Sequence, residues 1–136
     1  MGAWGPLTFD NDTACDWSYD LENSDDLSLV ESAFAEVEQT TAAEYLDQDL
    51  ACNALAACEV LARLRGHPGY NNAYTEAVDR WVAAHKLPPS SDLLARANTV
   101  IDRILADNSE LRELWDETGD PEWRDAVQDL RRRLTA

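Results

Sequence analysis

The most regular hydrophobic pattern in the chain lies between residues 41 and 65. Glycine and proline are absent from this stretch, and alanine and leucine dominate it, so its intrinsic helix propensity is high. Its apolar residues form two adjacent stripes at helical spacing, a wider apolar face than a surface helix needs. The pattern therefore predicts a buried central helix. Thr41 and Glu44 fit a capping box at its start, and Gly66 is placed to end it.

Shorter amphipathic patterns flank this central segment, and no alternation typical of a β-strand is present. The pattern predicts an all-α fold: a single compact domain over residues 1–136, orthogonal or bundle-like, with six to seven helices around the central helix. Besides 41–65, we expect helices at about residues 12–22, 27–40, 74–86, 91–107 and 121–134, with 110–118 either a separate helix or part of a kinked one.

The first eleven residues contain two glycines and a proline and show no helical period. We expect residues 1–11 to form a non-helical arm held against the core by Trp4, Leu7 and Phe9. At the other end, the arginines at 131–133 fall where positive charge favours the C-terminus of a helix.

Charge is distributed unevenly along the chain, which carries a net charge of −16. Residues 1–62 contain fourteen Asp or Glu and no Lys or Arg, whereas residues 63–136 contain thirteen acidic and eleven basic residues. Such a surface repels phosphate backbones, so we expect no nucleic-acid partner. It suits a basic protein partner or cations. The alternative is a general acidic bias that serves only solubility.

The three cysteines lack metal-site spacing, and no Cys-x-x-Cys motif accompanies them. Cys52 and Cys58 lie about 9 Å apart along the predicted helix, beyond disulfide reach. We therefore expect Cys15, Cys52 and Cys58 to be small apolar residues in a reducing compartment. The chain has neither a signal-peptide pattern nor an apolar run long enough to span a membrane, so we expect a cytoplasmic protein without membrane contact.

The densest polar cluster is formed by Asp10, Asn11, Asp12 and Asp16. Either Asn11 or Asp12 can cap the first helix while the other carboxylates favour its dipole. Alternatively, the three carboxylates share a hard cation. The glycine and distal glutamate of an EF-hand loop are missing, so an EF-hand is excluded.

A second candidate lies at Glu44 and Asp47, which share a face of the predicted central helix with Gln48. Paired carboxylates on facing helices hold Mg²⁺ or Mn²⁺ in helical hydrolases. The motif occurs once here, and Glu31 upstream belongs to no matching motif.

The start of the chain carries a recognisable pattern: Gly-Ala-Trp-Gly at 2–5, Phe-Asp-Asn-Asp at 9–12, and Ala-Cys-Asp-Trp at 14–17. This pattern resembles the start of the bacterial family called domain of unknown function 4259. Residues 108–115, Asn-Ser-Glu-Leu-Arg-Glu-Leu-Trp, are similar to the family's C-terminal part, whereas Pro-Leu-Thr at 6–8 departs from it. The resemblance implies a small helical bacterial protein and assigns it no activity.

Three functional hypotheses follow. The first is a non-enzymatic module, immunity-like in character, that binds a basic protein through the acidic N-terminal half. The second is a hydrolase that uses a divalent cation at Glu44 and Asp47; otherwise no cofactor is expected. The third is a partner surface formed by the arm itself. Oligomeric state is left open. The candidate binding residues are Trp4, Asp10, Asn11, Asp12, Asp16 and Trp17.

Overall fold

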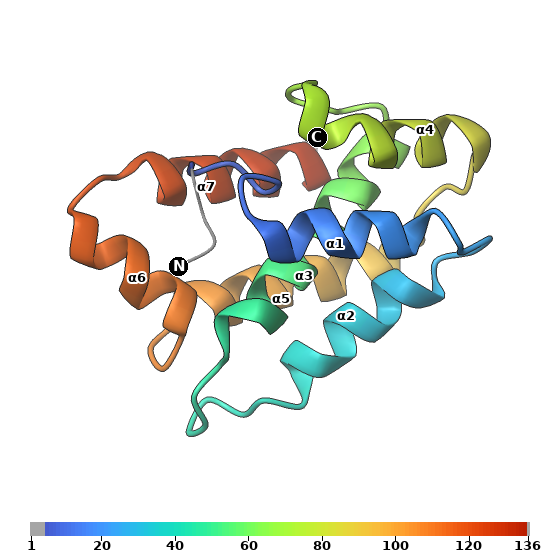
Figure 1. Cartoon of the computed structure of the whole chain (residues 1–136). Helices are drawn as coiled ribbons and strands as arrows, with labels where there is room; N and C mark the ends of the chain where they lie inside the picture. Colours follow the sequence, from blue (N-terminus) through green and yellow to red (C-terminus); the bar gives the residue numbers. More distant parts are fainter. Residues whose placement is uncertain (1–4, 136) are drawn as a thin grey trace.

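A computed structural model describes residues 5–135 of the chain and confirms the all-helical prediction (Figure 1). Within this range the chain forms seven α-helices and one short 3-10 helix. They are α1 (Asp12–Leu21), α2 (Ser28–Glu38), α3 (Gln48–Leu64), η1 (Ala73–Thr75), α4 (Glu76–Ala84), α5 (Ser91–Leu105), α6 (Glu110–Thr118) and α7 (Glu122–Thr135).

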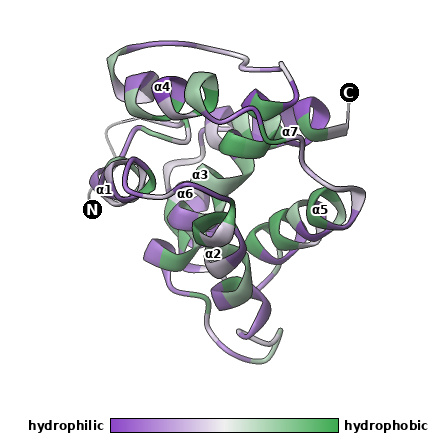
Figure 2. Cartoon of the chain, turned by 90° about the vertical axis from the view of Figure 1, so that its right-hand side faces the viewer, coloured by the Kyte–Doolittle hydropathy of each residue, from purple (hydrophilic) through white to green (hydrophobic). Residues whose placement is uncertain are grey.

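Helix α3 is the centre of the fold, and it contacts all six other α-helices. Every residue from 54 to 63 is buried. Many of these residues are alanine or cysteine, and such short side chains let neighbouring helices approach closely. Figure 2 shows α3 between α1 on one side and α5 on the other, with the hydrophobic sides of the outer helices turned inward. The predicted buried central helix is therefore present.

The start of this helix differs from the prediction, because α3 begins at Gln48 and not at residue 41. The Leu46 amide donates to the Asn108 carbonyl at 2.8 Å, and the Glu110 amide donates to the Leu46 carbonyl at 3.0 Å. This backbone pairing with a distant segment makes residue 46 part of a short bridge. Tertiary pairing therefore overrides the high helix propensity of residues 41–47.

Two carboxylates cap the observed start of α3. The Asp47 side chain accepts a hydrogen bond from the Asp49 amide at 2.7 Å, and the Glu110 side chain accepts one from the Gln48 amide at 2.9 Å. Glu110 comes from the first turn of α6. These bonds satisfy amide groups that the first turn of a helix leaves without intrahelical partners. The central helix therefore depends on a residue more than sixty positions away for part of its cap.

Other predicted boundaries are confirmed. The Asn11 side chain caps α1 by accepting from the Ala14 amide at 2.8 Å. Gly66 has a φ of 85°, the left-handed conformation expected after α3. Asn108 has a φ of 58° and separates α5 from α6, so residues 91–118 form two helices. Helix α4 is shorter than predicted because a 3-10 turn precedes it and because His85 already leaves the helix.

The described part of the N-terminal arm packs against the helices as expected. Phe9 is fully buried, and the Asp10 carboxylate accepts from the Leu7 amide at 3.1 Å, which closes a tight turn. Trp4 lies outside the described residues. The three cysteines are free thiols, with Cys52 and Cys58 buried. Among the described helices, none is long and apolar enough to cross a membrane.

Candidate functional site

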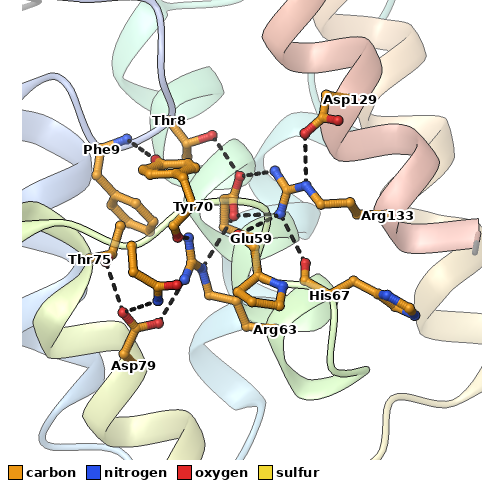
Figure 3. Close-up of polar contacts among 12 residues, drawn as sticks. Thr8, Phe9, Glu59, Arg63, His67, Tyr70, Thr75, Asp79, Asp129 and Arg133 are labelled. Atoms are coloured by element: carbon orange, nitrogen blue, oxygen red, sulfur yellow. Dashed lines mark hydrogen bonds and ion pairs between the residues drawn. The ribbon is translucent and has the colours of Figure 1, made fainter.

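A network of charged side chains lies buried where α3, α4, α7 and the arm meet (Figure 3). Its centre is Glu59 on α3, whose side chain is 1% exposed. The Glu59 carboxylate accepts two hydrogen bonds from the Arg133 guanidinium, at 2.7 and 3.1 Å, and one from the Thr8 hydroxyl at 3.3 Å. Arg63 Nε lies 3.3 Å from the same carboxylate. Glu59 therefore links the arm, the central helix and the last helix.

Arg63 extends the network towards α4. Its guanidinium donates to Asp79 at 2.7 Å and to the Tyr70 carbonyl at 2.7 Å. It also lies 5.2 Å from the centre of the Tyr70 ring, within cation–π range. Asp79 accepts further bonds from the Thr75 hydroxyl and the Asn71 amide, both at 2.8 Å. Arg63 therefore holds the 66–72 loop and the start of α4 against the central helix.

Arg133 extends the network towards the surface. Its Nε donates to Asp129 at 2.9 Å, and its Nη1 donates to the carbonyls of His67 and Pro68, each at 3.2 Å. Gly69 approaches so closely that a Cβ there would lie 2.6 Å from Arg133 Nε. The absence of a side chain at this position lets the loop close over the arginine.

This network is suited to holding the fold together. Burying a charge is costly unless it is paired and hydrogen-bonded, and each charged group here has a partner of opposite sign. Burial raises the pKa of the Tyr70 phenol well above its ordinary value, so the phenol stays neutral. The sequence carried a signal for the network that we missed: Glu59 and Arg63 are the only charged residues between positions 50 and 64, and they are one turn apart.

The N-terminal cluster predicted from the sequence divides into structural and exposed residues. Asn11 is the cap of α1, Asp10 closes the turn of the arm, and the Trp17 ring is buried. Asp12 and Asp16 are exposed. Across residues 5–135, no three or more Asp, Glu, His or Cys side chains are grouped so as to hold a metal ion. The geometry thus favours capping over cation binding for this cluster.

Glu44 and Asp47 do not share a helix face, which corrects the placement on which the metal hypothesis was based. Glu44 lies in the turn before α3, and its carboxylate accepts from the Thr41 amide at 3.0 Å. This hydrogen bond lowers the pKa of Glu44. Asp47 is the N-cap of α3. Glu31, the third carboxylate considered with them, lies 3.7 Å from Arg96 on α5. Each of the three already has a backbone or ion-pair partner.

The outer side of α1 carries an exposed row of carboxylates: Asp12, Asp16 and Asp20, spaced four residues apart. This spacing places them on one side of a helix. Among the described residues, none of the three forms an ion pair, whereas Glu22 just after α1 lies 3.0 Å from Arg80. The row is therefore an uncompensated strip of negative charge.

Comparison with known protein families matches residues 2–126 to the family described as a domain of unknown function, DUF4259. The chain belongs to this family. No curated protein and no solved structure matches it. The resemblance seen in residues 2–17 and 108–115 is therefore confirmed at the level of the family.

In space, these two family-like stretches meet beside α3. Residues from both line one cleft, which has room for about 30 Å³. Pockets for small molecules start at about 300 Å³, so this cleft is far too small for such a ligand. The lining residues that belong to the matching motifs are Gly5 and Asn11 from the first stretch and Leu111 and Trp115 from the second.

Proposed function

We propose that the protein is a non-enzymatic, immunity-like binding module that captures a basic protein through the outer side of α1. The observation that carries this proposal is the row of Asp12, Asp16 and Asp20, which is exposed and lacks counter-charges among the described residues. Aligned carboxylates of this kind attract a cationic partner before contact and orient it on approach.

The distribution of arginines supports this choice of surface. Arg96 lies 2.8 Å from Glu38 and 3.7 Å from Glu31, so it compensates two carboxylates of α2. Arg103 donates to five backbone carbonyls around residues 40–44 and 107–108. These two arginines thus lie against α2 and the loop before α3, whereas Asp12, Asp16 and Asp20 on α1 form no ion pair among the described residues.

The sign of the surface also argues for the class of partner. A nucleic acid or an anionic lipid surface presents negative charge, which a chain with a net charge of −16 repels. A basic protein has the opposite sign, and its association with this chain is favoured at long range. The proposal therefore predicts a partner with clustered Lys and Arg.

Two charge-matched triple variants test the proposal. In one, Asp12, Asp16 and Asp20 are changed to Asn; in the other, three exposed carboxylates elsewhere are changed to their amides. Both lose three negative charges. Association rates with a panel of small basic proteins, and with neutral proteins of similar size, are measured from low to moderate salt. The control positions are Asp92, Glu36 and Glu117.

For the wild type we expect association with the basic proteins to slow steeply as salt rises. We expect the α1 variant to associate about tenfold more slowly at low salt, a change within the range of electrostatic steering, and the control variant to stay close to the wild type. Equal slowing in the two variants would mean that only net charge matters. Association that is insensitive to salt would contradict the proposal outright.

A further inference from the structure

Beside the acidic row lies a hollow with aromatic walls. Tyr19 on α1 and Tyr74 on η1 are 60% and 47% exposed, which is unusual among the large apolar side chains of the described chain. Both line the same hollow, which has a volume of about 80 Å³. Its lining also includes two buried residues with small side chains, Ser18 on α1 and Ala77 on α4.

The charges around this hollow are arranged asymmetrically. Asp16 and Asp20 flank Tyr19 along α1, and Glu76 lies at the hollow's α4 side. The one cation that lines the hollow, Arg80, is paired with Glu22, to which it donates at 3.0 Å. An incoming cation therefore meets the exposed Tyr19 ring and the carboxylate of Glu76.

We propose that this hollow receives an arginine side chain of the basic partner, with its guanidinium packed against the ring of Tyr19. The inference rests on the proposed function and names the contact point within that surface. Aromatic faces attract cations, and the planar guanidinium stacks on them better than an ammonium group does. Asp16 lies one helical turn before Tyr19 on α1, and Glu76 lines the hollow, so carboxylates that a guanidinium pairs with are present on both elements.

Other occupants fit the hollow less well. A second copy of this chain carries the same charge of −16, so like charges oppose its approach. A drug-sized ligand needs a pocket of about 300 Å³ or more, several times the volume present. Tyrosine and arginine are, in contrast, the residue types that most often dominate the binding energy of protein interfaces.

The test uses a blocked hexa-arginine peptide as the probe and compares three single variants by calorimetric titration. Tyr19→Ala removes the ring, Tyr19→Phe keeps it, and Tyr45→Ala removes a tyrosine of similar exposure that lies elsewhere on the surface. We expect Tyr19→Ala to weaken binding about three- to tenfold, the range of a partly desolvated cation–π contact. We expect Tyr19→Phe and Tyr45→Ala to stay within about twofold of the wild type.

A hexa-lysine peptide and the salt dependence of binding separate the possible outcomes. The inference predicts that the lysine peptide binds more weakly and loses less when Tyr19 is replaced by Ala. If the arginine peptide binds in a salt-dependent way but Tyr19→Ala weakens it no more than Tyr45→Ala does, the inference is wrong and the proposed function stands. If neither peptide shows salt-dependent binding, both are wrong. Circular dichroism of each variant checks that the fold is retained.

Discussion

Replacing Arg133 by methionine tests whether the buried network holds the fold together. Methionine keeps a long unbranched side chain with similar helix propensity but removes the charge and all five donors. The change breaks both bonds to Glu59 and the bonds to Asp129, His67 and Pro68. Glu59 then stays buried with only Arg63 at 3.3 Å and the Thr8 hydroxyl at 3.3 Å.

The size of the effect follows from the burial of Glu59. Removing one partner of a buried ion pair typically costs about 3–5 kcal/mol, because the remaining charge is left uncompensated. Glu59 keeps one cation, Arg63, so we expect the lower end, about 3 kcal/mol. The lost bond to Asp129 adds little, because that carboxylate is substantially exposed. For a domain with a total stability of about 5–15 kcal/mol, this loss is large and lowers the Tm by roughly 10 °C.

The matched control is the adjacent Arg132→Met. Arg132 is 71% exposed and, within residues 5–135, forms its ion pair with Asp129 alone, at 3.2 Å, so its loss should change the free energy of unfolding by less than about 1 kcal/mol. Urea unfolding of the two variants, followed by circular dichroism, measures the difference at equal net charge. Equal stabilities would refute the reasoning, because they would mean that Glu59 does not need Arg133 to remain buried.

Three further changes test other features. Gly69→Ala should destabilise more than Gly66→Ala: both have positive φ, which costs alanine about 1 kcal/mol, but only at Gly69 does the new Cβ meet the Arg133 side chain. Burial raises the pKa of Cys52 to about 12 from an ordinary 9.0. Between about pH 9 and pH 12, the Cys52 thiol therefore loses its proton in the unfolded chain but keeps it in the folded protein. The free energy of unfolding is highest below about pH 9 and falls as the pH rises towards about 12. Cys52→Ala should flatten this decline by about 1.4 kcal/mol per pH unit. Asp47→Ala should lower the free energy of unfolding by about 1 kcal/mol through loss of the α3 cap, by the same amount with and without Mn²⁺.

Each of these outcomes can be contradicted directly. Equal losses of stability in Gly69→Ala and Gly66→Ala would show that the Arg133 side chain moves aside for the new methyl group at no measurable cost. If stability falls above about pH 9 as steeply in Cys52→Ala as in the wild type, the Cys52 thiol of the wild type is in contact with water. Thermal stabilisation by micromolar Mn²⁺ or Mg²⁺ that Asp47→Ala abolishes would support the hydrolase hypothesis instead, which stays a prediction.

The helices were predictable because their apolar residues recur at helical spacing and their ends carry strong local signals. Asn11 caps α1 and Gly66 ends α3 as the sequence indicates, since both act on neighbouring residues only. The start of α3 was not predictable. Residues 41–47 have good helix propensity, but the backbone of Leu46 is hydrogen-bonded to Asn108 and Glu110. A pairing with residues so distant in the sequence leaves no local pattern from which it could be predicted.

For the polar sites as well, features set by neighbouring residues could be predicted, whereas features set by residues distant in the sequence could not. The exposure of Asp12 and Asp16 follows from the helical phase of α1. The role of Arg133 does not: in the sequence it belongs to a run of three arginines that suits the end of a helix, and only the packing of α7 against α3 turns this one towards Glu59. Equally, Tyr19 and Tyr74 lie on different helical segments, and their shared hollow exists only once α1 and α4 are packed together.

The separation of charge along the chain has a consequence for how the protein is made. A ribosome adds fourteen acidic residues of this chain before the first arginine, Arg63. Until then the nascent segment has only like charges, which repel one another and keep it extended. The cations that pair with these carboxylates are added later: Glu38 pairs with Arg96, and Glu59 pairs with Arg133, which follows it by 74 residues. Synthesis of α7 therefore completes the neutralisation of the buried network, and we expect the domain to fold only once α7 has been made.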